Sequence, residues 1–293
     1  MTKGTLVGPY VMVLGTAQDG GYPQAGCRRD CCMAARADEA LKRLPACLAI
    51  VDPRCGKRWI IDCTPAFPEQ LARLDEAAGP EGGLAGIFLT HAHMGHYTGL
   101  VHLGREVMAA QALEVYAMDR MAAFLATDAP WRHLVDHGHI RLCRLDGGKR
   151  VPLSPGLSIT PLLVPHRDEI SETVAFRIDG PKRRVLHLPD IDGWAQWSIP
   201  LADILADVDV AYLDGTFFDA SELPGRDLSQ IAHPFIEHTL DVLSAFPAAL
   251  RTRVRFTHLN HSNPVCMGQP DALGRIKAMG CRVAVEWERF GLD

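Results

Sequence analysis

Three histidines follow an apolar, strand-like run, and this segment constrains the fold more than any other part of the sequence. The run that begins at Ile87 has the character of a β-strand and leads directly into His91, His93 and His96. His91 and His93 are two positions apart, so they share one face of an extended chain. Gly95 allows a tight turn before His96. Because neutral imidazole is the commonest nitrogen ligand of zinc, iron and manganese, the segment predicts half of a metal site.

The composition of the chain is that of an ordinary globular protein. Its 293 residues are 47% hydrophobic and 22% charged, and we expect residues 1–293 to form one domain. The net charge of −5 gives no electrostatic reason for a nucleic acid or an anionic membrane as partner. The sequence has no apolar run of ~18 residues, which a membrane span would need. Nine cysteines, an odd number with several in apolar strands, favour reduced thiols and a cytoplasmic location.

Short apolar runs bounded by glycine and proline recur along the chain and predict many strands. Strands dominate the first half and alternate with helices in the second, so we predict two sheets with helices outside them. The predicted strands, besides the one before His91, cover residues 9–14, 47–51, 58–62, 113–116, 140–145, 157–164, 173–178, 184–188, 209–213, 253–256 and 283–287. The predicted helices cover residues 68–78, 104–112, 119–126, 233–244 and 271–279.

Polar residues follow three of these strands. His166 comes after the strand 157–164, Asp190 after 184–188 and His258 after 253–256. A single histidine at such a position usually lies on the polar surface. Three positions in the order His, Asp, His are much less easily accidental, so we treat all three as ligand candidates.

Two further motifs lie near the N-terminus. Cys27, Cys31 and Cys32 place three thiols within six residues, which can converge on one metal ion with a fourth ligand from elsewhere. A redox pair or three unrelated thiols are the alternatives, and clustered thiols in a small loop favour the metal. The glycine-rich segment 15–21 lacks the lysine of a phosphate-binding loop, so it predicts close backbone packing beside a buried site.

The histidine segment resembles the H-x-H-x-D-H motif of the metallo-β-lactamase superfamily. The match is at His91, His93 and His96, and the departure is Gly95, where that family has aspartate. The later candidates follow the order of the family's remaining motifs. The resemblance implies an α/β fold, a four-layer αββα sandwich. It also implies that two histidines of the motif and one later histidine hold one metal ion. An aspartate would bridge this ion to a second metal ion.

Within the superfamily, the chain resembles the protein B family of pyrroloquinoline quinone biosynthesis. The similar segments are 15–24 with the cysteines that follow, 98–100, 214–216 and 257–264. Members of that family tend to lack active-site histidines that this chain keeps at His91 and His93. They are thought to oxidise a tyrosine-derived substrate.

The cysteine loop and the His-x-x-His ending also resemble the cyclic-phosphate phosphodiesterase of phosphonate metabolism. In that family three cysteines and the final histidine hold a structural zinc. The resemblance therefore implies a zinc site formed by Cys27, Cys31, Cys32 and His261, although the cysteine spacing differs here.

Carried over to this chain, the motifs define two ion positions. His91, His93 and His166 can hold one metal, with Asp190 as a further or bridging ligand. A second ion would have His96, Asp190 and His258. Two bridged ions would lower the pKa of a shared water and favour hydrolysis of an ester, lactone or phosphodiester. We expect Zn²⁺ at the structural and active sites, with Fe²⁺ or Mn²⁺ as alternatives at the active site.

Gly95 keeps other functions open. Two histidines and one carboxylate are the ligand set of non-haem iron oxygenases, so an oxygenase is the second interpretation. A hydrolase with one metal and a non-catalytic metal-binding scaffold are further alternatives. If the hydrolase interpretation holds, Gly95→Asp is expected to raise occupancy of the second metal position.

Other residues are expected around the cavity. Asp190, Asp214 and Tyr97 are the predicted catalytic residues, with Asp214 expected to steady a metal-bound histidine. His233 reaches the site from a loop or lies on the surface. Asp19, Arg167, Asp168 and Glu169 are expected to flank the cavity. The expected partner is a small-molecule or short-peptide substrate, and a homodimer is kept open.

Overall fold

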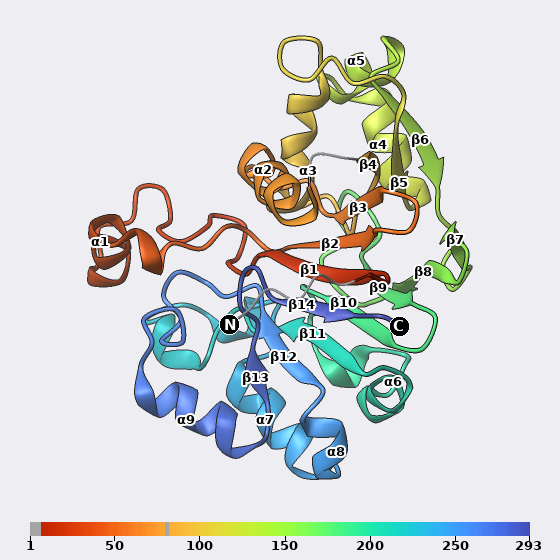
Figure 1. Cartoon of the computed structure of the whole chain (residues 1–293). Helices are drawn as coiled ribbons and strands as arrows, with labels where there is room; N and C mark the ends of the chain where they lie inside the picture. The colour runs from red at the N-terminus through yellow and green to blue at the C-terminus, as the bar shows by residue number, and fades with distance from the viewer. Residues whose placement is uncertain (1–6, 80–81) are drawn as a thin grey trace.

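In the computed structural model, which describes residues 7–79 and 82–293, two seven-stranded sheets pack face to face (Figure 1). The first sheet has the order β14-β1-β2-β3-β4-β5-β6, and the second has the order β13-β12-β11-β10-β9-β8-β7. The strands of the first sheet are β1 (Tyr10–Gly15), β2 (Cys47–Asp52), β3 (Lys57–Ile61), β4 (Gly83–Phe88), β5 (Leu113–Ala117), β6 (Ile140–Arg144) and β14 (Arg289–Gly291). Those of the second are β7 (Val151–Ser154), β8 (Leu157–Leu163), β9 (Val174–Asp179), β10 (Arg184–Leu188), β11 (Val210–Asp214), β12 (Val254–Thr257) and β13 (Arg282–Val283).

Helices cover the outer face of each sheet, which completes four layers (Figure 1). The first sheet carries α2 (Phe67–Ala78), α3 (Met94–Tyr97), α4 (Asp119–Thr127) and α5 (Trp131–Asp136). The second carries α6 (Leu201–Asp207), α7 (Ile236–Ser244), α8 (Ala248–Arg251) and α9 (Pro270–Ala278), and α1 (Asp30–Ala37) stands to one side. Short 3₁₀ turns are η1 (Glu39–Leu41), η2 (Thr98–Leu103), η3 (Trp194–Gln196), η4 (Ala220–Glu222) and η5 (Leu228–Gln230). The predicted αββα sandwich is confirmed.

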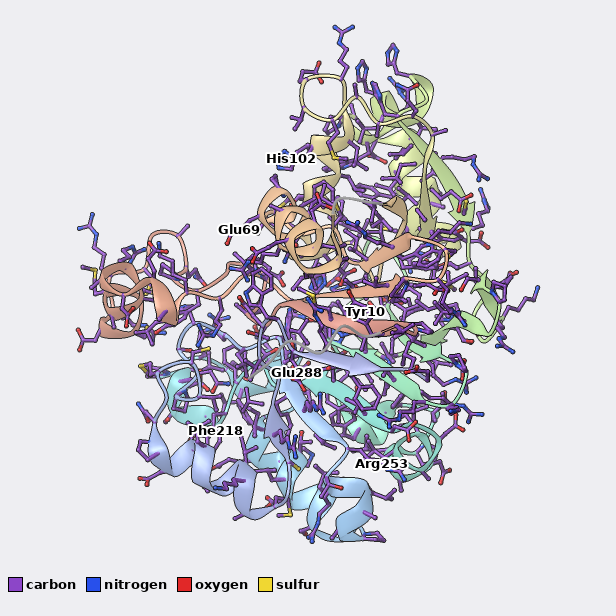
Figure 2. The ribbon with its side chains drawn as sticks, in the orientation of Figure 1. Tyr10, Glu69, His102, Phe218, Arg253 and Glu288 are labelled. Atoms are coloured by element: carbon purple, nitrogen blue, oxygen red, sulfur yellow. The ribbon has the colours of Figure 1, made fainter. Side chains whose placement is uncertain are left out.

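Burial on both faces explains why the central strands are continuous apolar runs. In β1, Met12 and Leu14 pack beneath the helices of the first sheet, whereas Val11 and Val13 point into the space between the sheets. Side chains fill these layers throughout (Figure 2). The two sheets therefore share one apolar interior, and helices seal its outer sides.

Two predicted elements are wrong. The segment 104–112 forms turns and not a helix, because Ala109 and Ala112 adopt positive φ angles that a right-handed helix excludes. The predicted last strand 283–287 is the crossing from one sheet to the other. β13 ends at Val283 beside β12, the chain turns at Trp287 with φ of 70°, and β14 then pairs with β1.

The candidate ligands of the histidine segment, Asp190 and His258 follow parallel strands, whereas His166 follows β8, which pairs antiparallel with β9. β4 is parallel to β3 and β5, and β10, β11 and β12 are parallel to one another. Ligand sites of open α/β sheets lie beyond the carboxyl ends of such strands. Among the described helices, none is long and apolar enough to cross a membrane.

Phe88 tests the packing between the sheets. Its buried ring stacks on Tyr116 at 4.2 Å between centroids and meets Phe176 edge-on at 5.6 Å. We expect Phe88→Ala to lower the free energy of unfolding by about 3–5 kcal/mol, because it leaves a cavity in the core. Urea denaturation measures the loss. Val107→Ala, a control at a side chain that is 61% exposed, should change stability by less than about 0.5 kcal/mol. A loss below about 1 kcal/mol for Phe88→Ala would contradict this packing.

Candidate metal centre

The three histidines of the motif segment lie just after the end of β4. His91 and His93 are on the extended chain that follows Phe88, the last residue of the strand, and His96 is on the short helix α3 after it. The single turn of α3 then brings His96 back over the strand end, where its backbone N–H donates to the carbonyl of His93. The rings of His91 and His96 lie 4.2 Å apart between centroids. The segment therefore directs its three imidazoles toward one small volume.

The first group of ligands consists of His91, His93 and His166. One ligand atom of each lies within 4.8 Å of the others. Nε2 of His166 is 3.3 Å from Nδ1 of His93. Tetrahedral coordination with metal–nitrogen bonds of about 2.0–2.1 Å separates ligand atoms by roughly 3.3 Å, so this spacing suits one ion.

Asp190 lies between this group and a second one. Its Oδ1 is 3.8 Å from Nε2 of His166, and its Oδ2 is 3.3 Å from Nε2 of His96 and 3.6 Å from Nε2 of His258. Ligand atoms of His91, His96 and Asp190 also lie within 4.8 Å of one another. The two oxygens thus face different histidine groups, which is the arrangement of a bridging carboxylate.

The second group consists of His96 and His258. It also contains the carboxylate of Asp19, which the motif alone did not identify. Oδ1 of Asp19 lies 3.2 Å from Nε2 of His96 and 3.1 Å from Nε2 of His258. Sequence reasoning placed Asp19 only beside the cavity and gave the second position two histidines and Asp190. Nothing in the spacing of the histidine motif could have indicated it, because Asp19 lies 77 residues before His96.

Two similar chains of hydrogen bonds, which we call relays, fix the orientation of two histidine rings. Each relay runs from a histidine through a threonine to an aspartate. The Thr90 hydroxyl donates to Asp62 and accepts from Nδ1 of His91, at 2.9 Å in each case. The Thr216 hydroxyl donates to Asp214 at 2.7 Å and accepts from Nδ1 of His258 at 2.9 Å. With Nδ1 acting as donor, Nε2 of each ring keeps its lone pair for the centre.

His96 and His166 are held directly by carboxylates. Nδ1 of His96 donates to Asp62 at 2.7 Å, and Nδ1 of His166 donates to Asp192 at 3.0 Å. Neither aspartate was among the predicted site residues. The signal for Asp62 was its place at the end of a buried apolar strand, where a carboxylate needs a polar partner.

Backbone strain is concentrated at the same place. Asp62 has φ of 68° and His258 has φ of 60°, both in the left-handed region. This conformation costs a residue other than glycine roughly 1–2 kcal/mol. The surrounding hydrogen bonds hold both residues in it, so their side chains point to the centre at the expense of stability.

The electrostatics of the cluster favour a bound cation. Burial and the neighbouring His96 lower the pKa of His91 well below its ordinary value, so its imidazole is neutral. Burial also disfavours charge on His96, but Asp62, Asp190 and Asp19 outweigh it and hold its pKa well above the ordinary value. Carboxylates thus create a negative field at this point.

Two buried atoms indicate that the cluster fits a metal. Among the described residues, Nε2 of His91 and Oδ2 of Asp190 are buried polar atoms without a hydrogen-bond partner. An unsatisfied buried polar atom costs about 1–3 kcal/mol, and more when charged. Metal ions bound by the two histidine groups would satisfy both atoms.

His233 also lies beside the cluster. Its Nδ1 donates to Oδ2 of Asp214 at 2.7 Å and lies 3.9 Å from Oδ1 of Asp190. Burial acts to lower the pKa of His233, but Asp214 and Asp190 reverse this and raise it to about 9. Of the two alternatives left by the sequence, the structure places His233 at the site and not on the surface.

Tyr97 lies away from the cluster, so its predicted catalytic role is withdrawn. Its buried ring packs edge-on against Phe124 and Trp131 within the apolar layer beneath the helices of the first sheet. The one-turn helix directs His96 to the centre and Tyr97, the next residue, to the opposite side. Sequence adjacency alone did not reveal this rotation.

The cysteine loop forms a separate cluster. Ligand atoms of Cys27, Cys31, Cys32 and His261 all lie within 4.8 Å of one another. Sγ of Cys32 is 3.4 Å and Sγ of Cys31 is 3.8 Å from Nδ1 of His261. Tetrahedral zinc with bonds of about 2.3 Å to sulfur and about 2.1 Å to nitrogen would separate these atoms by roughly 3.6 Å. The four residues therefore fit one structural zinc ion.

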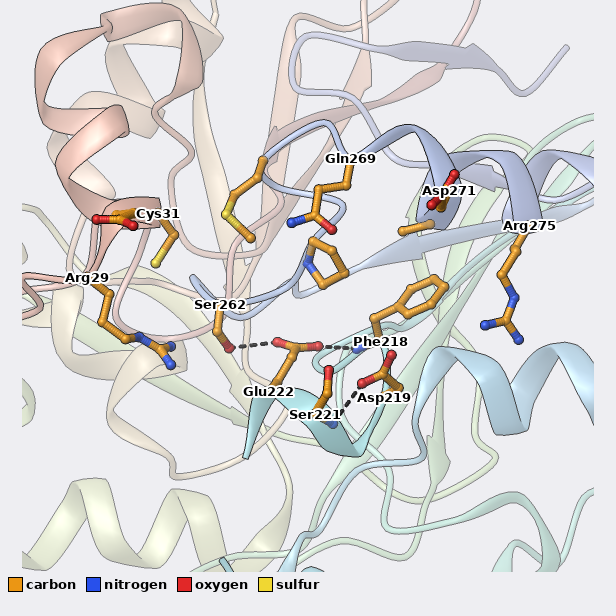
Figure 3. A pocket seen from close by; sticks show the side chains of 14 residues that line it. Arg29, Cys31, Phe218, Asp219, Ser221, Glu222, Ser262, Gln269, Asp271 and Arg275 are labelled. Atoms are coloured by element: carbon orange, nitrogen blue, oxygen red, sulfur yellow. Dashed lines mark hydrogen bonds between the residues drawn. The ribbon is translucent and has the colours of Figure 1, made fainter. Parts of the chain in front are cut away.

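A hollow lies beside this cluster, and Figure 3 shows a carboxylate in its floor. Glu222 accepts from the hydroxyl of Ser262 at 2.6 Å and from the backbone N–H of Phe218. Burial raises the pKa of Glu222 to about 7, against the effect of these hydrogen bonds. Because Ser262 follows His261 directly, Glu222 secures the loop that carries this histidine.

Comparison with known protein families agrees with this geometry. A family model described as "Beta-lactamase superfamily domain" matches residues 57–261, well over half of the chain. The chain belongs to the metallo-β-lactamase superfamily. The matched region begins at β3 and ends at His261, so it includes the histidine segment and every later candidate ligand.

This chain is also similar to curated proteins named coenzyme PQQ synthesis protein B. It is 27% identical to the protein of Xanthomonas axonopodis pv. citri, over 94% of this chain and 97% of that protein. It is 28% identical to the protein of Pseudomonas protegens, over 97% and 99% of the two chains.

Solved structures share the fold. Zn(2+)-bound PqqB from Methylobacterium extorquens superimposes with a TM-score of 0.79 at 20% identity, over 97% of this chain and 100% of that one. A diphosphatase from the PhnP family gives a TM-score of 0.68 at 21% identity, over 96% of each chain. The predicted resemblance to both families is confirmed, and the structural likeness at these identities shows the fold alone.

The cysteine cluster leads to a direct prediction. Cys31→Ser should lose one zinc ion per chain, and the midpoint of thermal unfolding should fall by roughly 5–10 °C, because structural zinc contributes folding free energy. Mass-spectrometric metal analysis and calorimetry measure both effects. Cys55→Ser, at an exposed thiol of the β2–β3 turn, is the matched control and should change neither. Unchanged zinc content and melting temperature in Cys31→Ser would contradict the site.

Proposed function

We propose that this protein is a metal-dependent hydrolase that acts on an ester, lactone or phosphodiester through a metal-activated water. The observation that carries the proposal is the position of Asp190. Its two oxygens face two different groups of histidine nitrogens at 3.3–3.8 Å. A single carboxylate placed in this way supports two adjacent ions, which is the arrangement of many metal-dependent hydrolases.

Most of these residues would bind the metal ions, and one residue would transfer a proton. His91, His93 and His166 would hold one ion, His96 and His258 the other, and Asp190 both. Bound divalent ions supply Lewis acidity, which lowers the pKa of a water and polarises the scissile group. His233, oriented by Asp214, stands at the rim of the cluster as the candidate proton donor to the leaving group.

Relatives of the fold favour hydrolysis. The structural neighbours include a diphosphatase of the PhnP family and Igni18, a metallo hydrolase of Ignicoccus hospitalis with a TM-score of 0.56. We extend this activity to the present chain as a proposal. Zn²⁺ is the first candidate ion, since one neighbour is a Zn(2+)-bound PqqB, and Fe²⁺ or Mn²⁺ are alternatives at the active site.

A second candidate function is an oxygenase related to coenzyme PQQ synthesis. The similarity to protein B over 94–97% of this chain favours it. It requires ferrous iron with coordination positions open to dioxygen. The third alternative, a non-catalytic metal-binding scaffold, has no observation that specifically favours it.

We also propose a substrate class, a cellular location and an oligomeric state for the enzyme. A small molecule or short peptide is the proposed substrate, without a nucleic acid or membrane partner, in agreement with the net charge of −5. None of the nine cysteines forms a disulfide, which supports a reducing cytoplasm as the proposed location. A homodimer is retained as the proposed oligomeric state to be checked by light scattering.

The decisive experiment compares hydrolysis with oxygen uptake. We expect protein supplied with Zn²⁺ or Mn²⁺ to hydrolyse a generic phosphodiester or lactone, and a chelator to abolish the activity. Asp190→Asn should lower kcat at least about 100-fold and lower metal content, because the bridging charge is lost. Asp146→Asn, at an exposed carboxylate, is the matched control. Substrate-coupled oxygen uptake with ferrous iron and no hydrolysis with any metal would overturn the proposal in favour of the oxygenase.

His233 is tested separately. His233→Asn should lower kcat by about 10²–10⁴-fold while metal content stays at the wild-type level, because this residue moves a proton and does not hold an ion. The loss should be smaller for substrates whose leaving group is a weak base. Equal loss for all leaving groups, or a loss of metal, would show that His233 has a different role.

A further inference from the structure

The second ion position has a carboxylate that comes from an unexpected part of the chain. We infer that Asp19 has replaced the motif aspartate as a ligand of the second ion, and that Gly95 is glycine because Asp19 occupies its side-chain space. The inference rests on the proposed metal-dependent function and assigns one of its ligands. It concerns a residue outside the family match, which begins at residue 57.

The distances around Asp19 suit a residue that shares one ion with His96 and His258. Its Oδ1 lies 3.2 Å from Nε2 of His96 and 3.1 Å from Nε2 of His258. Oδ2 of Asp190 lies 3.3 and 3.6 Å from the same two nitrogens. These four separations scatter around the roughly 3.3 Å expected between ligand atoms of a tetrahedral ion with bonds of about 2.0–2.1 Å.

Gly95 and Asp19 compete for one volume. A Cβ atom added at the buried Gly95 would overlap Cα, Cβ and Cγ of Asp19, well inside the 3.0 Å limit of real Cβ contacts. The obstacle includes the Asp19 backbone, so rotation of a flexible side chain cannot remove it. A carboxylate therefore reaches this place from position 95 or from position 19, but not from both.

Backbone pairing explains how the N-terminal loop reaches the centre. Ala17 forms a parallel bridge with Leu259, and the backbone N–H of Gln18 donates to the Leu259 carbonyl at 2.8 Å. The loop thus runs beside the segment that carries His258, and the next residue is Asp19. Gly21, with φ of 68°, then turns the chain away from the site.

The same loop is attached to the cysteine cluster at its other end. The Tyr22 hydroxyl donates to the Cys31 carbonyl at 2.9 Å, and the backbone N–H of Gln24 donates to Sγ of Cys32 at 3.3 Å. Asp19 is therefore held between two fixed points, the strand end at His258 and the cysteine cluster. Such support on both sides gives a loop residue the positional accuracy that a ligand needs.

The relocation changes the interpretation of Gly95. The oxygenase alternative rested on a second position with two histidines and one carboxylate. With Asp19 the position has two histidines and two carboxylates, so one of the places that dioxygen would need is filled. Gly95→Asp alone should consequently weaken the second ion, contrary to the expectation from the motif, because the added side chain would displace Asp19.

Metal counting in single variants tests this inference. Zinc per chain is measured by mass spectrometry after dialysis, and the affinity of the weakest ion by competition with a fluorescent chelator. We expect three zinc ions in the wild type and two in Asp19→Asn, with affinity for the lost ion lowered by more than the ~10–100-fold that outer-shell changes cost. Gly95→Asp should also lose this ion.

The controls separate this inference from the proposed function. Asp146→Asn should retain three ions, and circular dichroism should show that each variant is folded. Three ions at wild-type affinity in Asp19→Asn would overturn the relocation and leave the hydrolase proposal standing. A wild type with three ions that hydrolyses no substrate would overturn the hydrolase and leave Asp19 as a ligand.

Discussion

The buried carboxylate of Asp190 is the constraint on which the site depends. A charged group in this position is costly unless opposite charge and hydrogen bonds compensate it. Histidine nitrogens surround it on both sides, and Oδ2 has no hydrogen-bond partner among the described residues. The two sheets bring the ends of β4 and β10 to the same edge, so the fold creates this cost and places the ligands that a compensating cation requires.

The conformations that orient these ligands lower the stability of the folded chain. Asp62 and His258 hold left-handed backbone conformations, and each of two threonines links an aspartate to a histidine. The relays set the proton on Nδ1, which leaves Nε2 as the free donor of electrons. Strain and buried hydrogen bonds at the ends of rigid strands are therefore features of the site and not defects of the fold.

The N-terminal loop links the two metal clusters. Its first part pairs with the backbone beside His258, and its last part is attached to the cysteine cluster. Family motifs describe the histidine segment well, but Asp19 of this loop lies outside them. The helix predicted over residues 104–112 was wrong because Ala109 and Ala112 adopt positive φ angles, which the residue type alanine does not indicate.

The sequence by itself determined the αββα sandwich, the convergence of His91, His93, His166 and Asp190, and the cysteine cluster with His261. The four active-site residues follow apolar strands whose ends meet at one place, whereas the cysteine cluster with His261 was implied by the resemblance to a known family. Only the tertiary structure decided the position of Asp19, the rotation of Tyr97 away from the centre and the supporting role of Asp62. These depend on side-chain direction and on contacts between segments far apart in the chain, which periodicity and motif spacing do not encode.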